Sequence, residues 1–505
     1  MPTPGENQPT FGPELIFALA GAVGTDLNQV STALEASLST VGYDSEEIGL
    51  SALLDLVDWS TIKGAPDIDD ETLDRHIETR MEAGNCFREA LDRGDALALL
   101  AIFRISRLRT SPLEPRPRHA YILRSLKHPD EVDTLREVYG PHFFLVSAYA
   151  PVDARAAWLT RRIQKDWERK ALTSSDASAE GKAWDLIERD RLEAGRTLGQ
   201  QLGATFPKAD LFVDARRRTR LESEIERFVE LLFGHPFRTP TQHENAMFHA
   251  QAAALRSSAP SRQVGAVITT PTGEIIAVGT NEVPKAGGGQ YWPDDKEDHR
   301  DHNRDDPDVS GSEKRTVVEQ ILARLKEAGW LSKKSADSSA DDFFRLTEGL
   351  RIQDLIEFER VVHAEMSAIT DAARRGVKVQ DAYLYTTTFP CHECTRHLIG
   401  AGIHRLFYIQ PYPKSLAARL HDDSVEIDRD DPPKGKLRFE PFVGVAPRRY
   451  LELFTAGPDD RKKEGQVQPP QPGWFPKVLP PTPPPAGGPE SAGADTRKGS
   501  GEHEG

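Results

Sequence analysis

Short apolar runs alternate with segments of helical periodicity in the first half of the chain, and this alternation restricts the fold more than any other feature. The run ELIFALAG (14–21) is almost entirely apolar and ends in glycine, which predicts a buried strand. The segment after it predicts a turn and an amphipathic helix, because apolar residues recur at helical spacing: Leu27, Val30, Leu34 and Leu38. Strands that alternate with helices are typical of a parallel sheet covered by helices.

The same alternation continues along this half of the chain. Residues 70–109 predict one long helix, and residues 130–140 predict a shorter helix that ends at a glycine. Residues 119–127 and 142–150 predict strands, because both contain clustered apolar and aromatic residues. Residues 209–215, ADLFVDA, predict the last strand of this half.

A second α/β pattern begins near residue 240. Its expected order is a helix, a two-stranded hairpin around the turn PTGE, a helix, a strand, a helix and a strand. The segments that carry this order are 244–258, 264–282, 358–376, 381–388, 394–402 and 404–410. A polar insertion separates the hairpin from the second helix, and its residues 294–308 are dense in Asp and His. Such a run predicts a solvated loop, with a second metal site as the alternative.

The chain has 505 residues, too many for one hydrophobic core. We therefore expect an α/β protein of two domains between loose ends. The predicted divisions are a flexible N-terminus at 1–12, a first domain at 13–238, a second domain at 239–455 with the insertion 284–350, and a tail at 456–505. The tail is rich in Pro, Gly and charge, so it cannot bury enough apolar surface to offset its ordering entropy, and we predict disorder there.

Charge and composition exclude several classes of protein. The formal net charge is −15, which argues against a broad nucleic-acid-coating surface but allows a local basic pocket for a phosphorylated small molecule. We expect no membrane partner, since no run of eighteen apolar residues appears and the first residues lack a signal-peptide pattern. The three cysteines do not make a disulfide framework, which favours a cytoplasmic location.

Two of those three cysteines stand three residues apart, directly after a proline. Cys391 and Cys394 share one face of a helix, and Pro390 favours a helix start at that point. The first turn of a helix favours thiolate over thiol, and two thiolates on one face are half of a zinc site. Taken alone, CxxC also fits a thioredoxin-like redox pair or a chance occurrence.

The remaining donors stand upstream, at His363 and Glu365. One imidazole and two thiolates supply three protein ligands, and this leaves the fourth position of a tetrahedral Zn²⁺ open to water, as in catalytic sites. Residues i and i+2 of a helix point about 200° apart, so His363 and Glu365 share a pocket only if the end of the helix projects into it.

His363-Ala364-Glu365 followed by Pro390-Cys391-x-x-Cys394 resembles the H-x-E and P-C-x-x-C signature of zinc-dependent nucleobase deaminases. The resemblance implies that the histidine and both cysteines bind Zn²⁺. It also implies that Glu365 is the catalytic general acid and base.

Residues 246–412 also resemble the deoxycytidylate deaminase family, through SRQVGAVI, GTNEVPKAGG and AGIHRLFYIQPYPKS. This resemblance implies a three-layer αβα cytidine-deaminase-like domain. It implies that Asn281 contacts the substrate sugar and that Tyr412 supplies an aromatic ring nearby. Arg262, just before the first strand of this region, and Lys414, which flanks the presumed sugar site, are further substrate-binding candidates, because their charge suits a phosphate.

The whole chain resembles the bacterial anti-phage dCTP deaminases, through phrases such as AMFHAQAAALRSS, YWPDD and PYPKSLAARLH. That resemblance implies an enzyme that converts deoxycytidine nucleotides to deoxyuridine nucleotides and depletes dCTP during infection. It further implies a homo-oligomer and control by a small inhibitory RNA or a phage trigger. The alternatives are a polynucleotide-editing deaminase, a housekeeping dCMP deaminase with a regulatory N-terminal domain, and a deaminase-like sensor without turnover.

The N-terminal half resembles a P-loop kinase domain with a degenerate Walker A loop. In LAGAVGTDL, Thr25 stands where the motif has Lys and Asp26 stands where it has Ser or Thr. Without the lysine, no obvious charge stabilises a transferring phosphoryl group, so we expect no kinase activity. Gly21, Gly24, Thr25 and Asp26 remain candidates for nucleotide binding, and a purely structural use of the two glycines in a tight turn is the alternative.

Overall fold

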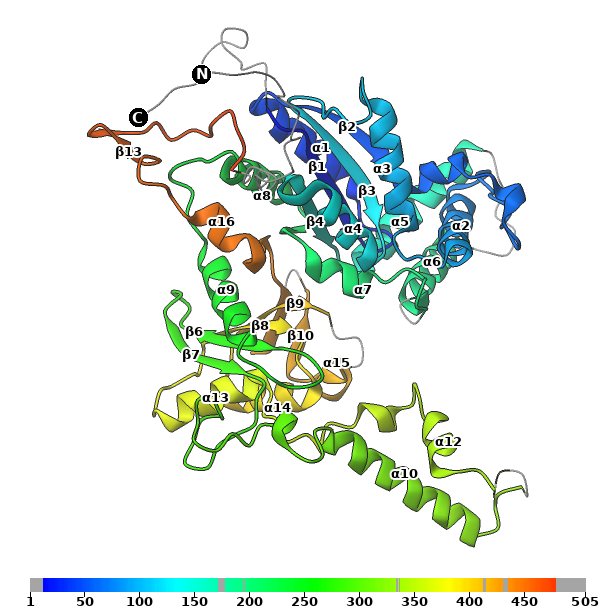
Figure 1. Ribbon diagram of the computed structural model, residues 1–505, viewed down its shortest axis with the longest axis vertical. Coiled ribbons are helices and arrows are strands. Elements are labelled where there is room, and N and C mark those ends of the chain that lie inside the picture. The colour runs from blue at the N-terminus through cyan, green and yellow to red at the C-terminus, as the bar shows by residue number, and fades with distance from the viewer. Residues whose placement is uncertain are drawn as a thin grey trace, which may run out of the picture.

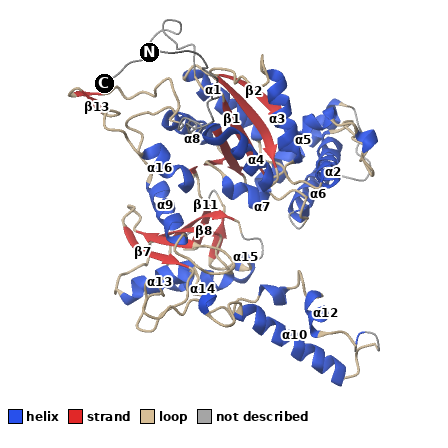
Figure 2. Ribbon diagram, viewed as in Figure 1, coloured by secondary structure: helices blue, strands red, loops and turns tan. Residues whose placement is uncertain are grey.

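The computed structural model describes residues 12–170, 178–193, 196–332, 335, 337–411, 415–429 and 435–477. Within them two six-stranded sheets form the centres of the upper and lower parts of the molecule (Figures 1 and 2). The α/β class predicted from the alternation of strands and helices is confirmed. No described helix is long and apolar enough to cross a membrane.

The first sheet has the order β2-β3-β1-β4-β5-β12, and its first five strands are parallel. The central strand is buried over its whole length, because its apolar residues face helices on both sides. The strands are β1 (Leu15–Gly21), β2 (Asp44–Gly49), β3 (His119–Leu126), β4 (Phe143–Tyr149), β5 (Leu211–Asp214) and β12 (Gly444–Val445). The helices of this part are α1 (Leu27–Thr40), α2 (Leu73–Leu91), α3 (Ala96–Leu108), α4 (Pro129–Tyr139), α5 (Val152–Arg169), α6 (Ala179–Glu193), α7 (Leu202–Thr205) and α8 (Arg218–Leu232).

The structure corrects the sequence expectation in two places here. The predicted helix 70–109 is two helices, because Asp92 takes a left-handed conformation with φ 52° and ends α2. Gly94 follows, where a Cβ would lie 2.2 Å from the imidazole of His128. Strand β2 was not expected, since its sequence DSEEIG is polar. It lies at the sheet edge and buries only Ile48.

The second sheet has the order β10-β11-β9-β8-β6-β7. The predicted hairpin is present, with β6 antiparallel to β7 and to β8, while β8 and β9 run parallel. The elements are α9 (Gln242–Ala254), β6 (Gly265–Thr269), β7 (Ile275–Thr280), α13 (Ala364–Arg374), β8 (Tyr383–Thr388), α14 (His392–Ala401), β9 (Arg405–Gln410), α15 (Ala417–Leu420), β10 (Val425–Ile427) and β11 (Leu437–Pro441). Helix α9 covers one face of the sheet, and α13 and α14 cover the other (Figure 1).

Two glycines allow these helices to approach the hairpin closely. A Cβ at Gly265 would lie 1.9 Å from the carbonyl oxygen of Ala250 on α9. A Cβ at Gly279 would lie 2.1 Å from the carbonyl oxygen of Ala364 at the start of α13. Both helices therefore sit nearer the sheet than any larger residue would permit.

The described part of the polar insertion includes α10 (Val309–Glu327) and α12 (Ala340–Arg345), which pack on each other. They form an arm that projects away from both sheets (Figure 1).

The two parts of the molecule are joined by more than a linker. Beyond the second sheet the chain returns to the first, where β12 pairs antiparallel with β5, and α16 (Tyr450–Phe454) follows. Glu244 on α9 bridges the parts, since it forms an ion pair with Arg227 on α8 and accepts a hydrogen bond from the amide of Val445. Part of the range 239–455 thus belongs to the first sheet.

Part of the tail also differs from its predicted disorder. At Gly473 and Lys477 the chain lies against the first domain, because their amides donate to the carbonyls of Phe233 and Leu232, at 2.7 and 2.6 Å. The rest of the tail, and residues 1–11 of the predicted flexible N-terminus, lie outside the described residues.

Candidate metal centre

Three side chains that stand far apart in the sequence meet at the starts of two neighbouring helices. His363 is the N-cap of α13, Cys391 is the N-cap of α14, and Cys394 lies in the first turn of α14. The Nδ1 atom of His363 lies 3.4 Å from Sγ of Cys391 and 3.3 Å from Sγ of Cys394. All three donor atoms lie within 4.8 Å of one another.

The donor set fits Zn²⁺. Tetrahedral bonds of ordinary length place a nitrogen and a sulfur ligand about 3.6 Å apart, close to the two distances observed. Among the described residues these three form the one group of His, Cys, Asp and Glu donors that could hold a metal. The Asp- and His-rich stretch 294–308 provides no such group.

Two residues at positions i and i+2 of a helix point in nearly opposite directions, but His363 is an N-cap and does not lie within the helix. Its backbone is extended, with φ −61° and ψ 154°, so the residue precedes the helix. Glu365 lies within the first turn of α13 and lines the same cavity as His363. The pair can therefore share one pocket.

Charges around the imidazole favour a cation between the three donors. Burial alone would lower the pKa of His363, but contacts with Cys391 and with Glu359 raise it to about 11. The hydrogen bond from Cys394 lowers the pKa of the Cys391 thiol to about 4. The same acceptors that favour a proton on the imidazole would also attract a metal ion.

Glu359 is a functional candidate that the sequence analysis missed. Its Oε2 atom lies 2.8 Å from Nε2 of His363, on the side of the ring opposite the two sulfurs. A carboxylate at this position fixes which ring nitrogen is free to bind a metal. Glu359 and His363 are four residues apart, which would indicate a contact only on a helix. The segment before His363 is not helical, so the sequence did not predict this contact.

The carboxyl group of Glu365 is buried, with 4 % of the residue exposed. Its Oε1 atom lies 3.2 Å from Oγ1 of Thr386 on β8. Burial raises the pKa of Glu365, and the nearby Cys391 adds to this effect. A carboxyl with a raised pKa is suited to take up and release a proton near neutral pH.

These groups face a cavity of about 150 Å³. Asn281 and Arg262, both predicted to bind substrate, line it together with His363, Glu365 and Cys391. The amide of Asn281 also orders the wall, because its Nδ2 donates to the carbonyl of Arg262 at 2.8 Å and its Oδ1 accepts from the amide of Val264 at 2.7 Å.

Other predicted site residues are not among the described residues that line this cavity. Tyr412 and Lys414 lie outside the described residues. The Walker-like residues belong to the first domain, where Gly21, Gly24 and Thr25 line a separate and larger cavity. Asp26 does not line that cavity, and its carboxylate caps α1 by accepting from the amide of Gln29.

The sequence of the second domain matches a known family. Residues 240–410 match the cytidine and deoxycytidylate deaminase zinc-binding region. ComE operon protein 2 of Bacillus subtilis (strain 168) is 40 % identical over 76 residues, which are 14 % of this chain and 40 % of that protein. The deoxycytidylate deaminase of Enterobacteria phage T4 is 29 % identical over 102 residues, 18 % of this chain and 53 % of that protein. The chain thus spans about half or less of these relatives.

Among solved structures, dCMP deaminase from the cyanophage S-TIM5 aligns with 41 % of this chain and 100 % of its own, at 15 % identity and a TM-score of 0.23. A gluconokinase from Sinorhizobium meliloti 1021 aligns with 44 % of this chain and 97 % of its own, at 15 % identity and a TM-score of 0.23.

The C-terminal region therefore contains a zinc-binding domain of the cytidine and deoxycytidylate deaminase class. Within that class, the domain is similar to deoxycytidylate deaminases such as the phage T4 enzyme.

Proposed function

We propose that the protein is a zinc-dependent hydrolase that deaminates a free deoxycytidine nucleotide, dCTP or dCMP, to the deoxyuridine nucleotide and ammonia. The observation that carries this proposal is the meeting of His363, Cys391 and Cys394 beside the buried carboxyl of Glu365 in one small cavity. Three ligands with an adjacent acid–base group are the composition of a catalytic zinc site.

The residues of the chain divide the chemistry among them. His363, Cys391 and Cys394 would hold Zn²⁺, which supplies a Lewis acid that makes water acidic enough to react near neutral pH. Glu365 accepts the proton of the attacking water and delivers it to N3 of cytosine as oxygen bonds to C4. Glu365 then takes the proton of the new C4 hydroxyl and delivers it to the amino group, the C4–N bond breaks, and ammonia leaves as the C4 carbonyl of uracil forms.

Substrate binding is assigned to the walls of the cavity. Asn281 holds the segment before β6, which carries Arg262, and lines the same cavity, so it can contact the sugar. Arg262 supplies the positive charge that a phosphate requires. Tyr412 and Lys414 follow β9 and remain candidates for the far side of the nucleotide.

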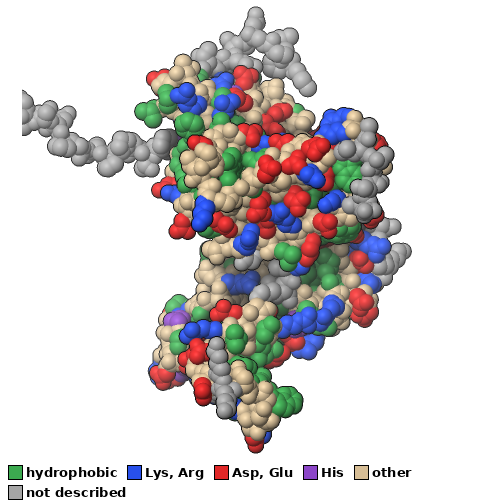
Figure 3. Space-filling view, turned by 90° about the vertical axis from the view of Figure 1, so that its right-hand side faces the viewer, with side chains coloured by type: hydrophobic (Ala, Val, Ile, Leu, Met, Phe, Trp, Pro, Cys, Tyr) green, Lys and Arg blue, Asp and Glu red, His purple; other side chains and the backbone are tan. Residues whose placement is uncertain are grey.

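A free nucleotide suits the surface better than a polynucleotide does. On the face drawn in Figure 3, acidic and basic side chains are interspersed over both parts of the molecule. A polynucleotide groove needs a continuous basic track with aromatic platforms. The cavity of about 150 Å³ is small and is lined in part by the buried acid Glu365.

Replacement of Glu365 tests the mechanism. We expect Glu365→Gln to keep its zinc but lose at least about 100-fold in turnover, because general acid–base catalysis contributes on that order. The measurement is chromatography of products from dCTP, dCMP, CTP and a cytosine-containing single strand, with zinc quantified in the same samples. Glu393→Gln is the matched control, since Glu393 lies in the same motif but pairs with Arg396 on the surface.

Turnover near that of the unaltered protein in Glu365→Gln would refute the mechanism, and conversion of the single strand alone would refute the choice of substrate.

We assign the enzyme a role in anti-phage defence through depletion of dCTP. We further propose that it acts as a homo-oligomer and is controlled by an inhibitory RNA or a phage-derived trigger. If this assignment is right, cells that carry Glu365→Gln lose protection in plaque assays, whereas cells that carry Glu393→Gln keep it.

A further inference from the structure

We propose that the acidic stretch 294–308 acts as a brace for the cavity at the metal centre. Asp301 in this stretch pairs with Arg360 and thereby positions the segment 355–362, which forms one wall of the cavity and carries Glu359. For substrate binding this inference rests on the proposed function, whereas for zinc binding it rests on the three metal donors and the partner of the histidine alone.

The segment 355–362 leads into α13 and contains neither a helix nor a strand. A β-bridge joins its end to the domain, where the amide of Val362 donates to the carbonyl of Glu282 at 3.1 Å. Irregular backbone has few hydrogen bonds of its own, so side-chain contacts decide where the rest of this segment lies. Three of its residues line the cavity of the metal centre: Ile356, Glu359 and Val361.

Arg360 fixes the middle of this segment. Its Nη1 atom donates to Oδ1 of Asp301, and its Nη2 atom donates to the carbonyl of His299 at 3.3 Å. The side chains of Arg360 and Asp301 are 27 and 13 % exposed, so water screens their attraction less than it would on an open surface. A guanidinium that is held by two acceptors has a defined orientation.

The neighbours of Arg360 are on the cavity side of the wall. Glu359 and Val361 both line the cavity, whereas Arg360 is not among the described residues that do so. Such alternation is typical of extended backbone, in which successive side chains point to opposite sides. A shift of Arg360 would therefore move both neighbours, and with them the 2.8 Å contact between Oε2 of Glu359 and Nε2 of His363.

Asp301 belongs to a set of acids in the stretch that are engaged in ion pairs. Asp295 pairs with Lys285, and Asp298 pairs with Arg300 at 2.6 Å. These three acids recur at every third residue, and their side chains are 13 to 17 % exposed. The remaining acids face solvent, among them Asp294, Glu297, Asp305 and Asp306. One set of acids thus faces cations of the domain, and the other set is solvated.

The stretch is also attached to the body of the second domain. Arg256, just after α9, places its guanidinium 3.7 Å from the ring centre of Trp292 and donates to the carbonyl of Tyr291 at 3.0 Å. The ring of Tyr291 packs edge-on against His299, with 5.4 Å between the ring centres. The brace therefore has a fixed base, and Arg360 transmits its position to the wall of the cavity.

Zinc affinity of the full-length protein, measured by competition with a chromophoric chelator, tests the brace apart from turnover. We expect Asp301→Asn and Arg360→Gln each to lower zinc affinity about three- to tenfold, because Glu359 remains present but is held less firmly. Asp301→Asn in the Glu359→Gln background should cause no further loss, because the brace acts through Glu359. General destabilisation would weaken zinc binding equally in both backgrounds.

Steady-state kinetics test the effect on the wall. At saturating zinc, Asp301→Asn and Arg360→Gln should raise KM for the deaminated nucleotide about tenfold and change kcat less than about threefold. The reason is that Ile356 and Val361 belong to the displaced wall, whereas Glu365 lies on α13.

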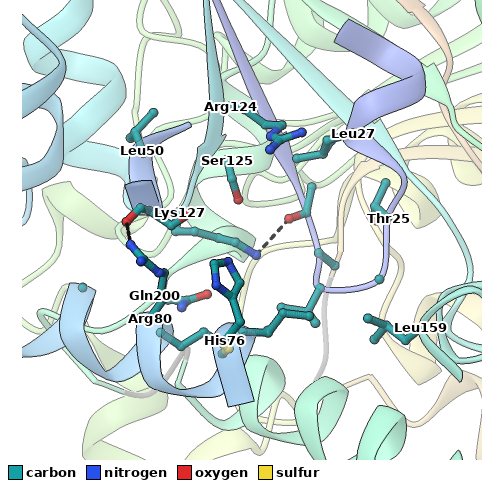
Figure 4. Close-up of a pocket in the computed structure, with 18 of the residues that line it drawn as sticks. Thr25, Leu27, Leu50, His76, Arg80, Arg124, Ser125, Lys127, Leu159 and Gln200 are labelled. Carbon is teal, nitrogen blue, oxygen red and sulfur yellow. Dashed lines mark hydrogen bonds between the residues drawn. The ribbon is translucent and has the colours of Figure 1, made fainter. Parts of the chain in front are cut away.

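Three variants serve as controls. Asp305→Asn and Arg304→Gln remove exposed charges from the same stretch. Lys127→Gln removes an ion pair with Asp190 in the first domain, where Lys127 lines the separate cavity drawn in Figure 4. All three should leave zinc affinity and KM unchanged, and circular dichroism establishes that every variant is folded.

Equal zinc affinity in Asp301→Asn and Asp305→Asn would overturn the brace. A loss in the Glu359→Gln background as large as that in the unaltered protein would overturn it as well, and an unchanged KM would overturn its role in substrate binding. The expected zinc affinities in a protein that deaminates no nucleotide would support the brace and refute the proposed function.

Discussion

At the residue scale, the orientation of His363 depends on a contact outside the three metal donors. Its Nδ1 atom faces the two sulfurs, and its Nε2 atom is held by Glu359 at 2.8 Å. The carboxylate fixes the ring and increases the electron density that the imidazole can offer to a cation. Glu359 therefore acts as a positioning residue, through the histidine.

Loss of this carboxylate should weaken metal binding. We expect Glu359→Gln to lower zinc affinity about 10- to 100-fold, the usual effect of losing such a partner. Competition with a chromophoric chelator measures the affinity directly, apart from turnover. Glu357→Gln is the control, because Glu357 stands two residues earlier and is exposed. Equal zinc affinity in both variants would contradict the positioning role.

At the element scale, the metal centre depends on how closely α13 approaches β7. His363, Ala364 and Glu365 lie at the start of α13, and the carbonyl of Ala364 faces Gly279 with no room for a Cβ. The packing of α13 against β7 therefore sets the distance of His363 and Glu365 from the sheet.

A methyl group at this contact should displace the site. We expect Gly279→Ala to destabilise the protein by about 1–3 kcal/mol, as overpacking does, and to reduce both zinc content and deaminase turnover. Gly400→Ala on α14 is the control, since nothing lies within 4 Å of the added carbon. Urea denaturation and zinc analysis measure the two effects. A folded Gly279→Ala protein with full zinc content would contradict this prediction, because α13 would then accommodate the added methyl group without displacing the site.

Regular elements and the metal centre were predictable from the sequence to different degrees. Strand β1 and the hairpin were evident, because apolar runs and a turn sequence are local signals. The meeting of His363 with Cys391 was predicted from the motif. The contact of Glu359 with His363 was not predicted, because Glu359 lies in an irregular segment whose sequence has no periodic pattern. The break at Asp92 was likewise hidden within a continuous helical pattern.

At the scale of the whole molecule, the carboxyl group of Asp428 links the two sheets through hydrogen bonds. Tyr149 at the end of β4 and Tyr408 on β9 both donate hydrogen bonds to Asp428, which follows β10, the second of them at 2.9 Å. Burial raises the pKa of Asp428 to about 6, against the lowering effect of the two hydrogen bonds and of Arg216. The join is therefore sensitive to pH.

The sign of this sensitivity follows from the raised pKa. The folded protein keeps the proton of Asp428 up to about pH 6, whereas the unfolded chain loses it near pH 4, so stability falls as pH rises between these values. We expect the free energy of unfolding, measured relative to that of Asp428→Asn, to decrease by on the order of 2 to 3 kcal/mol from pH 4 to pH 7. Urea denaturation of both proteins measures the difference. A difference independent of pH would contradict the assignment.

Contacts at this scale were the least predictable from the sequence. Nothing in the two-residue strand Gly444–Val445 indicates pairing with β5, because so short a segment has no pattern of its own. The tail was predicted to be disordered from its composition, yet Gly473 and Lys477 bond to the first domain through backbone groups, which composition does not report.

The return of the chain to β5 has a consequence for biogenesis. On the ribosome, strand β5 emerges long before its outer neighbour β12, and the second sheet is made in between. Until Val445 is synthesised, the nascent N-terminal sheet carries an open edge, which is a site for wrong pairing. The last step in closing the first domain thus waits for the second to be made. A chain stalled or cleaved within the second sheet would leave that edge exposed, a feature that cellular quality control can detect.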